Sequence, residues 1–105
     1  MWQLAEEIGY TPITTFWDDF SIAEKFGSQA IDDTAKRCFD EWKHDYKYLT
    51  ELIMVLNHKS WYYDSKNNRP ISDLYSKLYY KYDSLAIEAL KNNEEGLHYY
   101  FRTLD

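Results

Sequence analysis

Two Glu-x-x-His pairs, Glu41–His44 and Glu95–His98, have the spacing of metal ligands on a helix. In four-helix bundles, two such pairs and a glutamate from each of the two other helices form a di-iron carboxylate site. Here Glu41 and His44 fall on the polar side of the surrounding helical pattern, and Glu95 precedes a glycine. The glutamates of the other helical segments also lie off the apolar positions. We therefore predict no metal and no cofactor.

Two further residues have reactive side chains, Cys38 and His58. Cys38 lies on an apolar stripe and is expected to be buried, whereas a catalytic thiolate needs exposure and a positive neighbour. His58 adjoins another apolar stripe, where a histidine is either a hydrogen-bonded structural residue or a general base. No candidate nucleophile lies in a recognisable catalytic motif, so we favour the structural role for His58. We predict that the protein is not an enzyme.

Length and composition predict one domain over residues 1–105. The formal charge of −6 opposes general binding to a phosphate backbone and suits a basic partner surface. A single cysteine excludes an internal disulfide and indicates a reducing compartment. The N-terminal residues lack a signal-peptide pattern, and the longest apolar run, LIMVL, is too short to span a membrane. We expect a cytoplasmic protein without membrane association.

The hydrophobic periodicity predicts an all-α fold, a compact single-domain bundle of four main helices. Three Gly and two Pro are too few for an all-β domain. We expect a leader over 1–13 with a short helix ended by Gly9, a helical core over 14–92, and a tail over 93–105 with one short helix around 94–102. The main helices are predicted over 16–26, 29–45, 46–65 and 71–91.

Capping residues predict where these helices begin. Thr15 and Ser28 are the expected N-caps of the first and second helices. Asp45 either caps the third helix or lies within a bend that joins it to the second. The third helix is apolar nearly all round, so we expect it at the centre of the bundle.

Acidic residues are concentrated in the N-terminal half of the chain. Residues 14–45 contain eight acids and four basic residues. Such a surface either solvates two amphipathic helices or mimics a phosphate backbone and occupies a nucleic-acid-binding cleft. Exposed tyrosines favour binding, because tyrosine is enriched at interfaces. The predicted partner-binding residues are Asp32, Asp33, Asp40, Glu41, Asp45, Tyr48, Tyr62 and Tyr80.

Two segments that interleave lysine and tyrosine, KHDYKY and YSKLYYKY, suggest an alternative. Single-strand binders stack bases on aromatic side chains within basic grooves. Acids lie within or beside both segments and the net charge has the wrong sign, so direct nucleic-acid binding is the less favoured hypothesis. A homodimer closed by Tyr80 and its neighbours is a further alternative.

Three segments, TFWDDFSIAEKFG, AIDDTAKRCFDEWKHDYKYLTELIMVLNHKSW and YYFRTLD, resemble a family of short uncharacterised helical proteins encoded by phages and mobile elements of gut bacteria. In size and acidity the chain is also similar to anti-CRISPR proteins. This resemblance implies a non-enzymatic inhibitor in the cytoplasm of a bacterial host, where it would occupy the basic nucleic-acid-binding surface of a type II CRISPR effector nuclease. The alternatives are a small nucleic-acid-binding or regulatory module and a homo-oligomeric structural protein of unknown partner.

Overall fold

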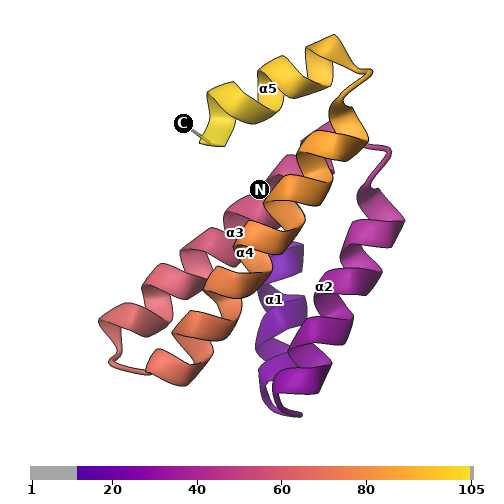
Figure 1. Ribbon diagram of the computed structural model, residues 1–105. Helices are drawn as coiled ribbons and strands as arrows, with labels where there is room; N and C mark the ends of the chain where they lie inside the picture. The colour runs from indigo at the N-terminus through magenta and orange to yellow at the C-terminus, as the bar shows by residue number, and fades with distance from the viewer. Residues whose placement is uncertain (1–11, 105) are drawn as a thin grey trace, which may run out of the picture.

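The computed structural model describes residues 12–104, with side chains from residue 16 onwards. Within this range the chain forms helices and no strand, so the all-α prediction is confirmed (Figure 1). The described residues form five helices in place of four main ones, because the short helix expected around 94–102 is a complete helix that packs on the bundle. The short helix predicted before Gly9 lies outside the described residues. The helices are α1 (Pro12–Glu24), α2 (Ser28–Trp42), α3 (Tyr46–Ser65), α4 (Arg69–Leu90) and α5 (Glu94–Leu104).

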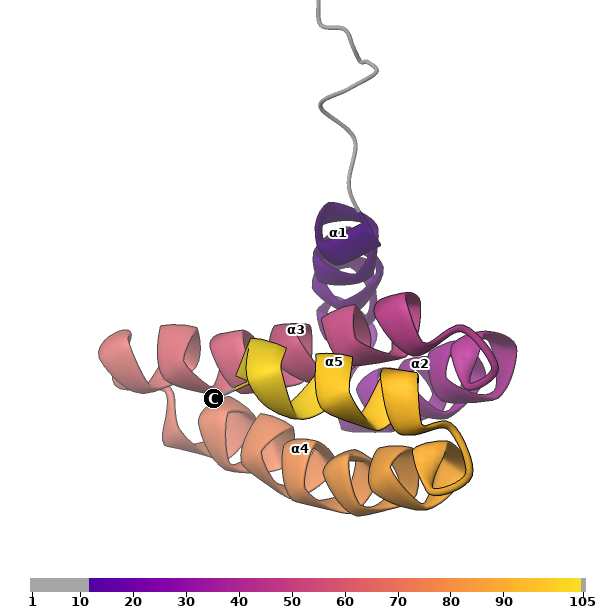
Figure 2. The ribbon, with the colours of Figure 1, turned by 90° about the horizontal axis from the view of Figure 1, so that it is seen from above.

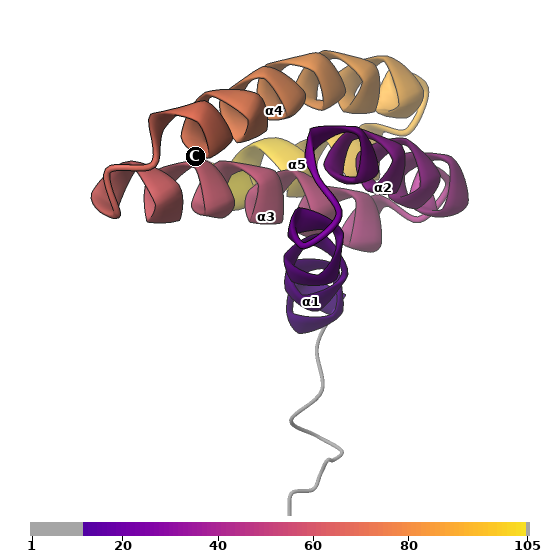
Figure 3. The same cartoon turned by 90° about the horizontal axis from the view of Figure 1, so that it is seen from below.

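Helix α3 lies at the centre and contacts all four other helices, as its apolar sequence predicted. Its most extensive contact is with α4, which runs antiparallel beside it (Figure 1). Helix α1 crosses α3 steeply and projects from the side of α3 that lies away from α4 (Figures 2 and 3). Helix α5 folds back over the end of the bundle where α3 begins and α4 ends.

The core is built from the apolar stripes that the helical period predicts. The helical period places Leu85 and Ala89 on the apolar stripe of α4 that includes Tyr82. Both are exposed, and α4 buries Ala86 and Leu90 instead. Beyond Tyr82 the buried positions therefore recur every four residues. The buried stripe residues include Phe16 and Phe20 of α1, Ile31, Ala35 and Cys38 of α2, Leu49, Leu52, Ile53 and Leu56 of α3, and Tyr75, Leu78 and Tyr82 of α4.

The observed N-termini of the helices show that two of the predicted N-caps were wrong and that the third was right. Thr15 lies inside α1, so it is not the N-cap. Gly27, not Ser28, is the N-cap of α2, and its φ of 108° is a conformation that favours glycine. Helix α2 ends at Trp42, and Asp45 then caps α3 by accepting hydrogen bonds from the backbone N–H groups of Lys47 and Tyr48. The alternative of a continuous bent helix is therefore wrong.

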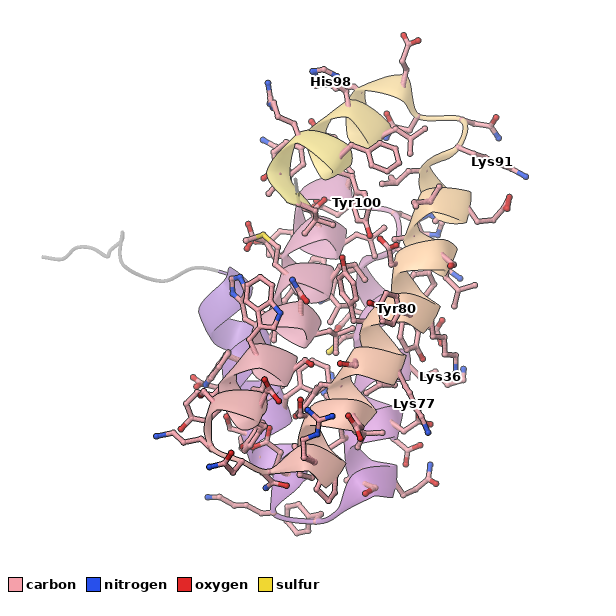
Figure 4. All side chains as sticks on the ribbon, turned by 60° about the vertical axis from the view of Figure 1, so that its left-hand side comes forward. Lys36, Lys77, Tyr80, Lys91, His98 and Tyr100 are labelled. Atoms are coloured by element: carbon pink, nitrogen blue, oxygen red, sulfur yellow. The ribbon has the colours of Figure 1, made fainter. Side chains whose placement is uncertain are left out.

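Tyr100 holds α5 against the bundle. Its side chain is 1% exposed and points from α5 into the molecule (Figure 4). The hydroxyl group donates a hydrogen bond to Oδ1 of Asp83 on α4. Tyr46, at the start of α3, donates a second hydrogen bond to Oε2 of Glu95 at 3.1 Å. The C-terminal segment therefore completes the core.

Candidate partner-binding surfaces

Four of the five acids predicted to bind a partner lie on α2, most of them on its outward face, and Asp45 lies at the start of α3. Asp33, Asp40 and Glu41 are exposed, and Asp32 is half-buried. Asp33 accepts a hydrogen bond from the side-chain amide of Gln29 at 2.9 Å. Because residues four apart lie on the same side of a helix, these carboxylates share their face with the basic residues of α2.

Two basic residues partly neutralise this face. Nζ of Lys36 lies 3.1 Å from Oδ2 of Asp40. The guanidinium group of Arg37 lies 3.9 Å from Glu41 and 3.8 Å from Asp19 of α1. Exposed ion pairs of this kind contribute little stability, so a cationic partner could compete for these carboxylates. The face nevertheless carries less net charge than the count of acids suggests.

Asp45 and Tyr48 both contribute to the fold. Asp45 is half-buried at the junction of α2 and α3, where its carboxylate caps α3. The Tyr48 ring stacks on Trp42, with 4.3 Å between ring centroids and 25° between ring planes. Their side chains fix the α2–α3 turn, and only part of each remains available to a partner.

Tyr62 and Tyr80 are more exposed, at 43% and 70%. Tyr62 of α3 meets the ring of Trp17 of α1 edge-on, with 5.7 Å between centroids. Tyr80 lies halfway along α4 and packs edge-on against Tyr79 (Figure 4). The predicted residues therefore do not form one site, because the acids lie on α2 and the most exposed tyrosines lie on α3 and α4.

Tyr80 borders a hollow of about 340 Å³ between α3 and α4, which we call the α3–α4 groove. Another exposed aromatic side chain, Trp61 of α3, also lines it and is 63% exposed. Analysis of the separate helical stripes did not predict this groove. Its lining residues are Asn57, Ser60, Trp61, Asp64, Arg69, Ser72, Asp73, Ser76, Tyr79 and Tyr80.

Three serines join the two helices beneath the groove. The Ser60 hydroxyl lies 2.6 Å from that of Ser76 and 3.2 Å from the carbonyl oxygen of Ser72. The Ser72 hydroxyl in turn donates to the carbonyl oxygen of Ser60 at 2.9 Å. Small side chains here let the helices approach closely while larger rings stand above them. The floor is thus fixed by satisfied hydrogen bonds.

A buried charged cluster connects α1, α3 and α4. Lys59 of α3 is 1% exposed, and its Nζ lies 3.0 Å from Oε2 of Glu24 and 2.7 Å from the Ser21 hydroxyl. Glu24 also accepts hydrogen bonds from the hydroxyl groups of Tyr63 and Tyr75. The ammonium group further lies 4.2 Å from the centroid of the Trp17 ring.

Burial determines what this cluster can do. Desolvation lowers the pKa of Lys59, and the hydrogen bond and negative charge of Glu24 partly oppose that shift. Burial also raises the pKa values of Tyr63 and Tyr75, and Glu24 adds to both shifts. A lysine this enclosed cannot reach a substrate as a nucleophile, so we assign the cluster to stability. Sequence analysis missed it, although Lys59 continues the 3–4 spacing of Leu52 and Leu56.

The described residues do not assemble a metal site. Within residues 12–104, no three His, Cys, Asp or Glu side chains come together as ligands. His98 lies on the outer side of α5, away from Tyr100 (Figure 4). Cys38 is buried as predicted, and its burial raises the pKa of the thiol to about 11. At neutral pH this thiol is therefore not a nucleophilic thiolate.

Comparisons with protein-family models, curated proteins and solved structures found no match. In the part of the chain that the structure describes, none of the helices has the length and apolar character needed to cross a bilayer.

Proposed function

We propose that this chain is a non-enzymatic interaction protein of a mobile element that inhibits a type II CRISPR effector nuclease. In this proposal it occupies a basic surface that the nuclease uses to bind nucleic acid. The observation that carries the proposal is the outward face of α2, where Asp33, Asp40 and Glu41 are exposed along one helix. A row of carboxylates is complementary to the arginines and lysines that bind a phosphate backbone.

The charge of the whole chain supports the same proposal. A formal charge of −6 on 105 residues increases the rate of encounter with a basic surface and opposes encounter with free nucleic acid. Lys36 and Arg37 lie among the acids of α2, and the partner would have to displace or accommodate them. We therefore expect binding that is sensitive to salt and that depends on contacts beyond charge.

Exposed aromatic side chains supply such contacts. Tyr62 and Tyr80 were predicted to anchor a partner, and both retain large exposed areas. Tyrosine and tryptophan side chains bury large areas at little cost in conformational entropy and dominate many interfaces. The acidic face would bring the partner in, and the aromatic side chains would slow its dissociation.

The experiment is DNA cleavage by several guide-loaded type II effector nucleases, with and without a molar excess of the protein. Size-exclusion chromatography of each mixture runs in parallel. The proposal expects inhibition and co-elution with at least one nuclease. Absence of both with every nuclease tested would reject the nuclease as partner. Inhibition without co-elution would reject stable occupation of the nuclease surface.

A second candidate function is direct binding of single-stranded nucleic acid by α4. Lys77, Tyr80 and Lys81 are exposed on one side of this helix, which is the observation that favours it. Figure 4 shows Lys77 and Tyr80 on the same helix. A gel shift at micromolar protein and low salt would support this function. Its absence with both single-stranded DNA and RNA would contradict it.

A further inference from the structure

We propose that the α3–α4 groove binds an arginine side chain of a partner protein. The inference rests on the proposed function only in assuming that the protein acts by binding another protein. It concerns a surface separate from the acidic face of α2, and its test needs no nuclease. Failure of the groove proposal and failure of the inhibitor proposal are therefore separate results.

The aromatic walls are the first observation. Trp61 of α3 and Tyr80 of α4 are 63% and 70% exposed where they line the groove. Each ring also contacts a neighbouring ring: Trp61 lies 5.6 Å from the His58 ring and Tyr80 lies 5.3 Å from the Tyr79 ring, both measured between centroids. Exposed rings beside a hollow offer faces on which a planar cation can stack.

The charges of the groove are the second observation. Asp64 and Asp73 supply two carboxylates, and Arg69 supplies one guanidinium group. Arg69 is already paired, with Nη1 at 3.0 Å from Oδ1 of Asp64. Within residues 12–104, Asp73 forms neither an ion pair within 4 Å nor a side-chain hydrogen bond. The groove therefore offers one unpaired carboxylate to a positively charged occupant.

The floor determines which part of the occupant enters. Ser60, Ser72 and Ser76 bond one another through hydroxyl and backbone carbonyl groups, so these three hydroxyl groups do not require a ligand. A volume of about 340 Å³ suits one long side chain better than a folded element. Arginine fits these features because its guanidinium group stacks on aromatic faces and pairs with a carboxylate through two hydrogen bonds.

The test is an NMR titration of the ¹⁵N-labelled full chain, observed at the tryptophan indole N–H signals. Trp61→Phe assigns the Trp61 signal. The probe is an acetylated, amidated Gly-Arg-Gly tripeptide, titrated to about 10 mM. The matched control replaces arginine by citrulline, which keeps the shape and removes the charge. We expect a saturable shift of the Trp61 signal with a Kd on the order of 1 mM, and at least tenfold weaker binding of the citrulline peptide.

Three variants localise the interaction, all at exposed positions. Asp73→Asn and Tyr80→Ala are each expected to weaken peptide binding at least fivefold. Glu94→Gln removes an equal charge from α5 and is expected to leave peptide binding unchanged. The dispersion of each spectrum reports whether the variant is folded.

Six outcomes would overturn the proposal. Four come from the peptide titrations: no saturable shift at Trp61, an equal response to the citrulline peptide, unchanged binding by Asp73→Asn, and an equal loss with Glu94→Gln. Saturable binding of inorganic phosphate in place of the arginine peptide would reassign the groove to anions held by Arg69. A Trp61 signal that moves with protein concentration alone would assign the groove to a second copy of the chain. Either result would also reject an arginine site.

Discussion

Nζ of Lys59 lies 3.0 Å from Oε2 of Glu24, and the lysine side chain is 1% exposed. This pair joins the middle of α3 to the C-terminal end of α1. The same carboxylate accepts hydrogen bonds from Tyr63 and Tyr75, so α1, α3 and α4 meet at one charged group. Helix α1 crosses the α3–α4 pair steeply (Figure 2). The cluster therefore fixes the position of α1 on this pair and also stabilises the fold.

Removing one member of this pair should destabilise the protein strongly. Lys59→Met keeps the length of the side chain but leaves the Glu24 carboxylate without its counter-ion. We expect the free energy of unfolding to fall by about 3 kcal/mol, the lower end for a broken buried pair, because the Glu24 side chain is 15% exposed and can gain water. Urea denaturation followed by circular dichroism measures the change.

Lys77→Met is the matched control, because Lys77 is exposed on α4 (Figure 4) and this substitution should change stability by less than about 0.5 kcal/mol. In the double variant Glu24→Gln, Lys59→Met, the loss should be about 2 kcal/mol smaller than the sum of the two single losses. Additive losses would show that the two side chains do not interact.

Stability should fall at alkaline pH because buried tyrosines resist ionisation. Burial is the main cause that raises the pKa values of Tyr63, Tyr75, Tyr82 and Tyr100 above the ordinary 10.0. Above about pH 10 the unfolded chain loses these protons while the folded chain keeps them. Each such tyrosine then lowers the free energy of unfolding by up to about 1.4 kcal/mol per pH unit.

Lys59 acts in the opposite direction. Its pKa is lowered from 10.5, so between the lowered value and 10.5 the folded chain binds fewer protons and its contribution rises with pH. The several tyrosines outweigh this single lysine above about pH 10. Urea denaturation at about pH 8 and about pH 11 tests the balance, with tyrosinate absorbance as a second readout.

Tyr75→Phe and Tyr100→Phe should each reduce the alkaline loss, and Tyr80→Phe, at an exposed ring, is the control. Equal stability of the unsubstituted protein at the two pH values would contradict the claim that buried tyrosines with raised pKa values lower stability at alkaline pH.

The period of the helical stripes was sufficient to predict the all-α fold and the central position of α3. It could not predict the α3–α4 groove, whose shape depends on the packing of Ser60 against Ser72 and Ser76 on another helix. It did not predict the burial of Lys59, which lies one turn after Leu56, because lysine is rarely buried unless it is paired with a charge on another helix. It underestimated α5, because the period of one helix does not show that Tyr100 is buried and bonded to Asp83 on another helix.

Gly27 should be difficult to replace. Its φ of 108° and ψ of −180° lie in a region that side chains with a Cβ atom rarely adopt. A Cβ atom built there meets nothing within 4 Å, so the cost of Gly27→Ala comes from the backbone alone. We expect a loss of about 1–3 kcal/mol in the free energy of unfolding.

Ser28→Ala separates the two assignments of the α2 N-cap. If Gly27 is the N-cap, as observed, this substitution changes stability by less than about 0.5 kcal/mol. If Ser28 capped the helix through its side chain, the loss would be about 1 kcal/mol. Thermal unfolding of both variants measures the difference, and a larger loss for Ser28→Ala than for Gly27→Ala would contradict the observed cap.

The acidic face of α2 is tested by removing charge without reversing it, because lysines placed beside Lys36 and Arg37 would destabilise the helix. The triple variant Asp33→Asn, Asp40→Asn, Glu41→Gln removes the exposed carboxylates of this face. We expect at least a tenfold rise in the concentration that half-inhibits the nuclease, equivalent to about 1.4 kcal/mol of binding free energy. Inhibition by the unsubstituted protein should also weaken as salt rises from about 0.05 to about 0.5 M.

The matched control removes three exposed carboxylates elsewhere, Asp18, Glu88 and Glu94, by substitution with asparagine or glutamine. Both triple variants have the same net charge, so they differ only in where the charge was lost. Long-range attraction alone predicts similar, modest losses for both, since steering depends on the overall field. Direct contact with α2 predicts a large loss for the first variant only, at unchanged helicity by circular dichroism. Equal inhibition by both variants and the unsubstituted protein would reject the α2 face as the binding surface.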